Sequence, residues 1–139
     1  MGCNHCKEDP VISRRYSGEI LCKSCFFKSF EKNAHKELRK QINLLIKNSN
    51  IKIKKMGIGL SGGKDSTVAL HVLKSYIGER NIEIIGLSVD EGIANYRSES
   101  LDCAAYECEK LGIELEIFSY KELIGVTLGE LLIEKPPQG

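Results

Sequence analysis

The sequence predicts an α/β fold, a doubly wound parallel sheet, preceded by a small zinc-binding module and a long helix. Two Cys-x-x-Cys pairs lie within the first 25 residues, and a helical pattern fills most of the next 25. From residue 51 onward, short apolar runs alternate with helical patterns, as in parallel α/β sheets. We therefore expect a zinc knuckle over residues 1–25, a basic linking helix over 26–50 and the sheet domain over 51–139.

Composition narrows the class of protein. No apolar run approaches the roughly 18 residues of a membrane span, and the N-terminus lacks the apolar core of a signal peptide, so we expect a cytoplasmic protein with no membrane partner. Six cysteines in such a chain favour metal binding or catalysis over disulfides. Residues 1–55 hold 13 Lys/Arg and 5 Asp/Glu, whereas residues 56–139 hold 7 and 14. The first third of the chain is therefore suited to a polyanion.

The cysteine pairs of the zinc knuckle are separated by 15 residues. This spacing fits a tetrahedral zinc site of four thiolates, which has no open position for catalysis and is therefore structural. A redox dithiol pair or an iron–sulfur site is the alternative. His5 is expected to be a bystander or a supporting group. The predicted ligands are Cys3, Cys6, Cys22 and Cys25.

The segment between the pairs predicts a β-hairpin. Arg15–Tyr16 and residues 19–21 would form its strands, with a turn at Ser17–Gly18. Because so short a segment cannot build its own core, metal binding would supply most of its folding free energy, on the order of 10 kcal/mol.

Residues 26–49 predict one long helix with two distinct faces. Lysines four residues apart repel one another, so their row is either a solvated face or a track for RNA phosphates. The lysine row is Lys28, Lys32, Lys36 and Lys40, and the apolar stripe, expected to be buried, is Phe27, Phe30, Ala34, Leu38, Ile42 and Leu45.

In the sheet domain, apolar runs predict strands over 51–60, 82–89 and 113–118. Helical spacing predicts helices from Asp65 to Gly78, over 98–111 and over 120–134. Ligands of such sheets bind at the carboxyl ends of the strands. His71, Cys103 and Cys108 are interpreted as structural, the two cysteines as buried apolar residues. The core face of the first helix is predicted to be Val68, Ala69, Val72, Leu73 and Tyr76.

The segment Ser61-Gly62-Gly63-Lys64-Asp65-Ser66 follows the first strand and predicts an anion-binding cradle. Adjacent glycines let backbone N–H groups approach a ligand, and the following helix N-terminus adds its dipole. The lysine adds a positive charge, and Asp65 can cap the helix or hold Mg²⁺. A Walker A loop is excluded because Ile58 and Asp65 occupy two of its required positions.

A dinucleotide fingerprint also matches weakly here. The three glycines Gly57, Gly59 and Gly62 fit G-x-G-x-x-G, but the next acid at a strand end, Asp90, lies 28 residues further on instead of about 20. The contiguous Ser-Gly-Gly-Lys-Asp-Ser instead resembles the pyrophosphate loop of the PP-loop ATPases (adenine nucleotide alpha hydrolase-like fold).

The full set of motifs is more specific. The cysteine knuckle, the basic helix, the loop and a later Asp90-Glu91-Gly92-Ile93 followed by Tyr96-Arg97 are similar to the tRNA 2-thiouridine synthetase branch (TtuA/CtuA-type). Asn95 departs from the glycine of the family pattern, but Asn tolerates the left-handed conformation. The resemblance covers essentially the whole chain.

This resemblance implies an ATP pyrophosphatase that acts on tRNA. ATP would adenylate a uridine C2 oxygen with release of pyrophosphate, and a sulfur nucleophile would then expel AMP. Lys64 and Asp65 would be catalytic, the latter with Mg²⁺, while Asp90 has no assigned role. The implied ATP-binding residues are Gly59, Leu60, Ser61, Gly62, Gly63, Lys64, Asp65, Ser66 and Val89.

The resemblance also implies partners and a missing part. The partners would be tRNA, a sulfur donor (a ubiquitin-like thiocarboxylate carrier or inorganic sulfide) and a second copy in a homodimer. The family carries a later Cys-x-x-Cys that holds an iron–sulfur cluster, and its sheet has further strands. We therefore expect an incomplete fragment that lacks the cluster ligands and cannot itself transfer sulfur. The alternatives are another PP-loop enzyme (an amide-forming or lysidine-type synthetase) or a non-catalytic, zinc-dependent RNA-binding module.

Overall fold

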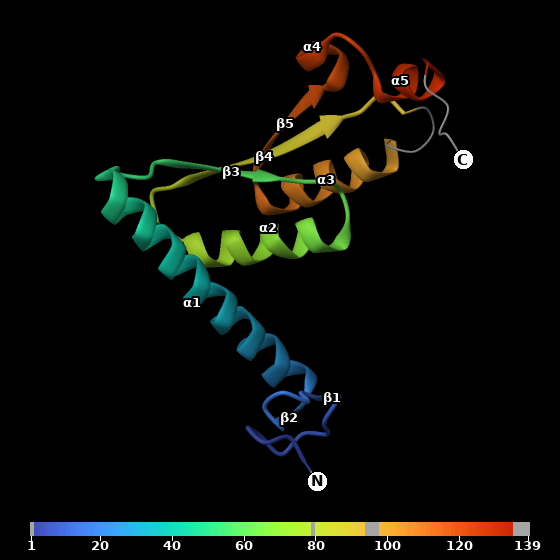
Figure 1. Ribbon diagram of the computed structural model, residues 1–139. Coiled ribbons are helices and arrows are strands. Elements are labelled where there is room, and N and C mark those ends of the chain that lie inside the picture. Colours follow the sequence, from blue (N-terminus) through green and yellow to red (C-terminus); the bar gives the residue numbers. More distant parts are fainter. Residues whose placement is uncertain (1, 79, 94–97, 135–139) are drawn as a thin grey trace. The chain divides into compact units, whose positions relative to one another are not determined.

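The computed structural model describes residues 2–78, 80–93 and 98–134 (Figure 1). The chain divides into two compact units, residues 1–51 and 52–139. In the part that the structure describes, no helix is both long and apolar enough to cross a membrane. The α/β fold with a parallel sheet, preceded by a four-cysteine module and a long helix, is confirmed.

The first unit opens with an antiparallel hairpin of β1 (Ile12–Ser13) and β2 (Ile20–Leu21), in which Ile12 pairs with Leu21. The hairpin was predicted, but its first strand lies earlier than expected. Residues 14–18 form the turn instead, because the N–H groups of Ser17 and Gly18 donate to the Arg14 carbonyl at 3.2 and 2.8 Å. Gly18 closes this turn at φ 69°.

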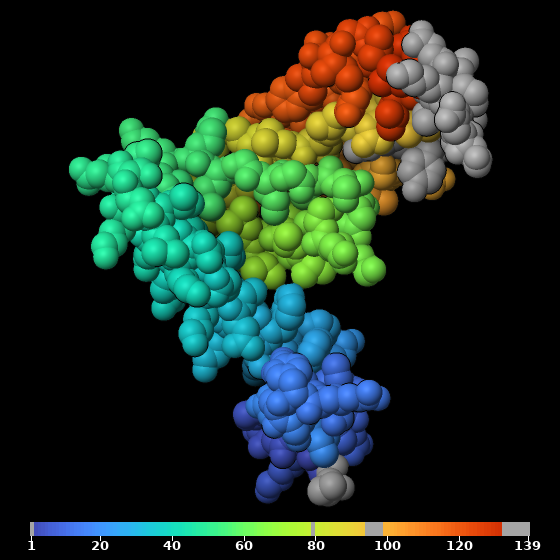
Figure 2. All heavy atoms as spheres, viewed as in Figure 1, coloured from blue at the N-terminus to red at the C-terminus, as the bar shows by residue number. Residues whose placement is uncertain are grey.

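Helix α1 (Lys23–Ser49) follows the hairpin directly and confirms the predicted long helix. It begins three residues before the expected start, because Cys22 acts as the N-cap and its side chain accepts a hydrogen bond from the Cys25 N–H. It ends where Asn50 adopts the left-handed conformation at φ 50°, a common helix terminus. In Figure 2 the hairpin and the first turns of α1 form one continuous block of atoms, in blue.

The expected burial of the apolar stripe on α1 is wrong. No described residue of the helix is buried, and Phe27, Phe30 and Leu45 are 55%, 42% and 60% exposed. The three-residue spacing correctly indicates an apolar face, but burial also needs a partner surface. Within this unit the two-residue strands of the hairpin are too short to cover a helix of 27 residues.

The second unit is a three-stranded parallel sheet in the order β3 (Lys55–Gly59), β4 (Glu83–Asp90) and β5 (Glu114–Ser119). The crossover helices α2 (Lys64–Ile77) and α3 (Ser98–Leu111) both lie on one face (Figure 1). This follows from right-handed crossovers between strands added in one direction. The first strand is shorter than the predicted range 51–60, since residues 51–54 form no strand.

The last predicted helix is two helices, α4 (Tyr120–Ile124) and α5 (Leu128–Glu134). Gly125 ends α4 in the left-handed conformation at φ 85°. The Thr127 hydroxyl then accepts a hydrogen bond from the Glu130 N–H at 3.1 Å and so caps the N-terminus of α5. A glycine and a capping threonine therefore interrupt what looks like one helical pattern.

The core lies between the sheet and helices α2 and α3. Of the predicted face of α2, Leu73 is buried and Tyr76 packs against the core, whereas Val68 is 46% exposed. Leu70 and Ile77, which were not predicted, complete the buried face. Cys108 is buried as predicted, but Cys103 is exposed, because residues five apart on a helix lie on different faces. The buried cluster is Leu60, Leu70, Leu73, Ile77, Ile84, Ala104, Cys108 and Ile113.

Candidate nucleotide site and metal centre

Hydrogen bonds to β4 hold the start of the loop that follows β3. The Leu60 N–H donates to the Leu87 carbonyl at 2.7 Å, and the Ser88 hydroxyl donates to the Leu60 carbonyl at 2.7 Å. Ser88 is 1% exposed, so this hydrogen bond is shielded from water. Sequence reasoning missed Ser88, although a hydroxyl inside an otherwise apolar strand was a signal that it holds a neighbouring backbone.

Gly62 occupies a position that only glycine fits. Its φ of 76° lies in the left-handed region, and a Cβ there would come within 1.9 Å of the Ser100 carbonyl oxygen. The loop therefore lies directly against the first turn of α3. Ser100 was not predicted, and nothing in the sequence near it indicates this contact.

The two serines of the loop are joined by hydrogen bonds. The Ser61 hydroxyl accepts from the Gly63 N–H at 3.3 Å and lies 3.2 Å from the Ser66 hydroxyl. Ser66 in turn donates to the Gly63 carbonyl at 3.0 Å. These contacts hold the loop as a tight turn around Gly63, the N-cap of α2.

Lys64 and Asp65 form the first turn of α2, and their side chains are 91% and 93% exposed. The Lys64 Nζ lies 3.9 Å from Asp65 Oδ1, an exposed pair that adds little stability. Both charged groups are therefore open to solvent at the positive end of the helix dipole, where an anion would be favoured.

The remaining predicted ATP-binding residues lie at the same edge of the sheet. Gly59, the last residue of β3, pairs with Leu87, and Val89 follows two residues later on β4. Asp90 ends β4, and its Oδ1 accepts a hydrogen bond from the Gly92 N–H at 2.9 Å. The structure thus brings Gly59, Leu60 and Val89 to the carboxyl edge beside the loop. Asn95, Tyr96 and Arg97 lie outside the described residues.

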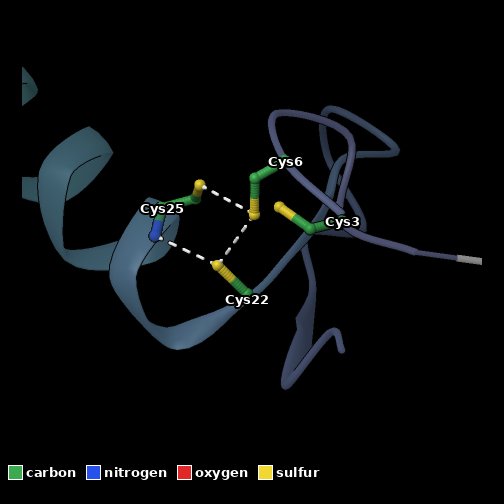
Figure 3. Close-up of side chains that lie close together, drawn as sticks. All are labelled: Cys3, Cys6, Cys22 and Cys25. Atoms are coloured by element: carbon green, nitrogen blue, oxygen red, sulfur yellow. Dashed lines mark hydrogen bonds between the residues drawn. The ribbon is translucent and has the colours of Figure 1, made fainter. Parts of the chain in front are cut away.

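The four predicted metal ligands form one cluster (Figure 3). Their sulfur atoms all lie within 4.8 Å of one another. The Cys6 sulfur is 3.5 Å from that of Cys22 and 3.7 Å from that of Cys25. A zinc ion bound by four thiolates at 2.3 Å separates them by about 3.8 Å, so the cluster fits that ion.

Backbone N–H groups also point at these sulfurs. The His5 N–H donates to Cys3 Sγ at 3.5 Å, and the Cys25 N–H donates to Cys22 Sγ at 3.4 Å. Burial raises the pKa of Cys3, but hydrogen bonds from the backbone of Cys22, His5 and Cys6 lower that pKa to about 6. The thiolate form, which binds metal, is thus stabilised at this position.

The pKa of Cys25 moves in the opposite direction, to about 12. Its side-chain hydrogen bond to Cys22 and its burial both raise it, since neighbouring thiols compete for the negative charge. A divalent cation shared by all four sulfurs would neutralise this repulsion. The donor set is therefore suited to a metal ion rather than to four free thiols.

A polar network joins the hairpin to α1. Arg14 NH1 donates to Glu19 Oε2 at 3.2 Å and to the Ser29 hydroxyl at 2.8 Å, and its guanidinium lies 5.4 Å from the Phe26 ring centroid. His5 Nε2 lies 3.2 Å from Glu19 Oε1. The hydrogen bond with His5 and those with Ser17 and Arg14 lower the pKa of Glu19. His5 thus supports the knuckle through Glu19 and its backbone.

Two protein-family patterns match this chain. The sequence pattern of the PP-loop domain family matches residues 34–131. The pattern of the N-terminal LIM domain of the 2-thiouridine synthetase TtuA matches residues 3–27. Each match contains one of the two sites, the loop and the cysteine cluster respectively.

Curated relatives share the sequence over nearly all of this chain. Cytoplasmic tRNA 2-thiolation protein 1 of Xenopus laevis is 39% identical over 94% of this chain and 37% of its own length. The tRNA 2-thiolation protein NcsA of Haloferax volcanii is 36% identical over 99% of this chain and 43% of its own length. The chain thus spans about two fifths of the length of these relatives.

Solved structures share the fold. The U34-tRNA thiolase NcsA from Methanococcus maripaludis, solved with its 4Fe-4S cluster, superposes with a TM-score of 0.81 at 33% identity, over 98% of this chain and 44% of that one. The NH3-dependent NAD synthetase of Campylobacter jejuni, at 20% identity and a TM-score of 0.50 over 78% of this chain and 43% of its own, shares the fold alone. Residues 3–27 are similar to the N-terminal LIM domain of the 2-thiouridine synthetase TtuA, and the chain belongs to the PP-loop domain family.

Proposed function

We propose that this chain performs the ATP-dependent activation step of tRNA 2-thiolation. The observation that carries the proposal is the Ser61–Ser66 loop at the carboxyl edge of a parallel sheet, in the same chain as a four-cysteine knuckle. ATP would adenylate a uridine C2 oxygen and release pyrophosphate, and AMP would leave when sulfur attacks C2.

The loop residues have distinct roles in this proposal. The N–H groups of the tight turn around Gly63 would bind the β- and γ-phosphates, where negative charge grows as pyrophosphate leaves. The Lys64 side chain is not packed against other described residues, so its ammonium group could move toward the growing negative charge. Gly59, Leu60 and Val89 would border the adenosine. Mg²⁺ would neutralise part of the triphosphate charge, and Asp65 is the carboxylate beside the loop that would hold it.

The cysteine cluster has a structural role. The four sulfurs would hold Zn²⁺ and so fold the hairpin against the first turn of α1. A closed four-sulfur site lacks an exchangeable position, so this metal would take no part in adenylation. The tRNA would be held partly by the exposed lysines of α1. The sulfur donor and a homodimeric assembly belong to the same proposal.

The experiment compares two lysines of α2. In the zinc-loaded full chain, tRNA-stimulated pyrophosphate release from ATP should fall at least 100-fold for Lys64→Ala, the loss expected when one charge-stabilising group is removed. Lys74→Ala, on the last turn of the same helix, should keep the wild-type rate. Equal rates for both variants would refute the role of the loop. Pyrophosphate release driven by a free carboxylic acid instead of tRNA would favour an amide-forming synthetase.

A further inference from the structure

The first unit contains a cavity away from the cysteine cluster. It has a volume of about 480 Å³ and is formed between the hairpin turn and one face of α1. This volume lies in the usual range of small-ligand sites. Its lining includes Arg14, Arg15 and Tyr16 from the hairpin, and Phe26, Phe30 and Asn33 from α1.

The wall of this cavity is already organised. Arg14 is held by Glu19 at 3.2 Å and by Ser29 at 2.8 Å, with its guanidinium over the Phe26 ring. Its side chain is 9% exposed, so it is fixed in place. The contacts that join the hairpin to α1 therefore also fix this wall.

Two aromatic rings at the cavity are open to solvent. Tyr16 is 82% exposed and Phe30 is 42% exposed. Exposed aromatic rings beside arginines are the usual platform for unpaired nucleobases, which stack on them with little dependence on sequence.

The charge of the cavity fits an anion. No acidic side chain lines it among the described residues, and of its two arginines Arg14 is paired with Glu19, so Arg15 supplies the charge open to an anion. Arg15 is exposed and makes no ion pair within the part of the chain that the structure describes. Asn33, also exposed, offers both a hydrogen-bond donor and an acceptor, as a base edge requires. Residues 1–51 as a whole hold 10 Lys/Arg and 5 Asp/Glu.

We propose that this cavity binds one unpaired nucleotide of an RNA strand, with its base against Tyr16 and Phe30 and its phosphate at Arg15. Asn33 would contact the edge of the base. A duplex would not enter, because its bases are stacked on one another. The inference rests on the proposed function only for the identity of the RNA as tRNA.

The test measures binding of a fluorescein-labelled single-stranded RNA heptamer to the zinc-loaded full chain by anisotropy, without ATP. Phe30→Ala should weaken binding about tenfold, the loss of one stacked base. Phe30→Tyr keeps a ring and should bind within about twofold of wild type. Phe27→Ala is the matched control, because Phe27 lies three residues before Phe30 on α1, is exposed and does not line the cavity.

A second measurement tests whether the charge of Arg15 contributes to RNA binding. Arg15→Gln should reduce the slope of log affinity against log salt by about 0.7, the release of one counterion from a single strand. Competition by duplex RNA equal to that by single-stranded RNA would overturn the proposal. The same holds if Phe30→Ala and Phe27→Ala bind RNA alike. If Phe30→Ala instead changed self-association in sedimentation and left RNA affinity intact, the cavity would bind protein and the proposal would be wrong.

These outcomes are separate from those of the proposed function. Because the assay contains no ATP, loss of RNA binding in Phe30→Ala would support the cavity even if pyrophosphate release failed. Normal Lys64-dependent pyrophosphate release with unchanged RNA affinity in Phe30→Ala would refute only the cavity.

Discussion

The backbone of Gly62 lies so close to Ser100 that a Cβ at Gly62 would approach the Ser100 carbonyl oxygen to 1.9 Å. The Ser61–Ser66 loop and the first turn of α3 therefore share one packed contact. Any side chain at Gly62 must displace the loop or the helix, and both border the carboxyl edge of the sheet.

Gly62→Ala should consequently lower the free energy of unfolding by more than backbone strain alone would. Left-handed backbone in a non-glycine residue costs about 1–2 kcal/mol, and the contact with Ser100 adds to it. Gly112→Ala is the matched control, because Gly112 has φ 63° and open space around its Cβ position. Denaturant unfolding should show a larger loss for Gly62→Ala, together with weaker ATP binding. Equal losses would mean that the contact with Ser100 is not maintained.

The sequence predicted the elements of this region better than their contacts. Ser-Gly-Gly-Lys-Asp-Ser after an apolar run indicated a loop at a strand end, because glycines and a helix start are local signals. The contact of Gly62 with Ser100 spans 38 residues of chain and depends on how α3 packs. No periodicity carries that information.

The sequence also did not determine which face of each helix is buried. The prediction for α2 placed Leu73 in the core correctly, but it chose the exposed Val68 and Ala69 in place of Leu70 and Ile77. Both sets have helical spacing, and the side that faces the sheet depends on how the crossover is oriented. On α1, spacing indicated an apolar stripe, but Phe27 and Leu45 are exposed because burial needs a partner surface. The convergence of the four cysteines was predictable, since two closely spaced pairs on either side of a short hairpin are local signals.

Loss of one cluster sulfur should unfold the zinc knuckle. Cys22→Ser removes a ligand but keeps a hydroxyl that can cap α1, so we expect zinc content to fall from about one per chain to near zero. Cys103→Ser, at an exposed cysteine outside the cluster, should retain zinc. Full zinc content in Cys22→Ser by mass spectrometry would contradict the four-sulfur site.

The lysine row of α1 should contribute to RNA affinity through charge. All four lysines are exposed. Changing Lys28, Lys32, Lys36 and Lys40 to Gln should lower the salt slope of tRNA binding by about three, at 0.7–0.9 per phosphate contact. The measurement is a titration of tRNA at several salt concentrations. An unchanged slope would mean that the row is only a solvated face.

The contact between α2 and α3 should make stability depend on pH. His71 Nε2 lies 2.7 Å from Glu107 Oε2, and this hydrogen bond lowers the pKa of Glu107 below its ordinary 4.5. A carboxyl whose pKa is lowered by folding stabilises the protein above its unfolded pKa, and this contribution disappears as pH falls through the folded pKa. Glu107→Gln should therefore be less stable than wild type above about pH 4.5, and the difference should vanish in more acidic solution.

The control for this prediction is Glu109→Gln on the same helix. Glu109 is exposed and makes no ion pair within the described residues, so its variant should follow the wild-type melting temperature at each pH. A constant difference between wild type and Glu107→Gln across pH 3–7, measured by thermal melts, would show that ionisation of Glu107 does not matter.

Activation of a tRNA uridine as proposed requires ATP to be split between its α- and β-phosphates. This is measured by incubating the zinc-loaded full chain with tRNA and ATP labelled at the α-phosphate, without a sulfur donor. We expect AMP, free or attached to tRNA, and pyrophosphate in equal amounts, with both products lost in Lys64→Ala. Labelled ADP with inorganic phosphate, or AMP formation that does not depend on tRNA, would contradict it.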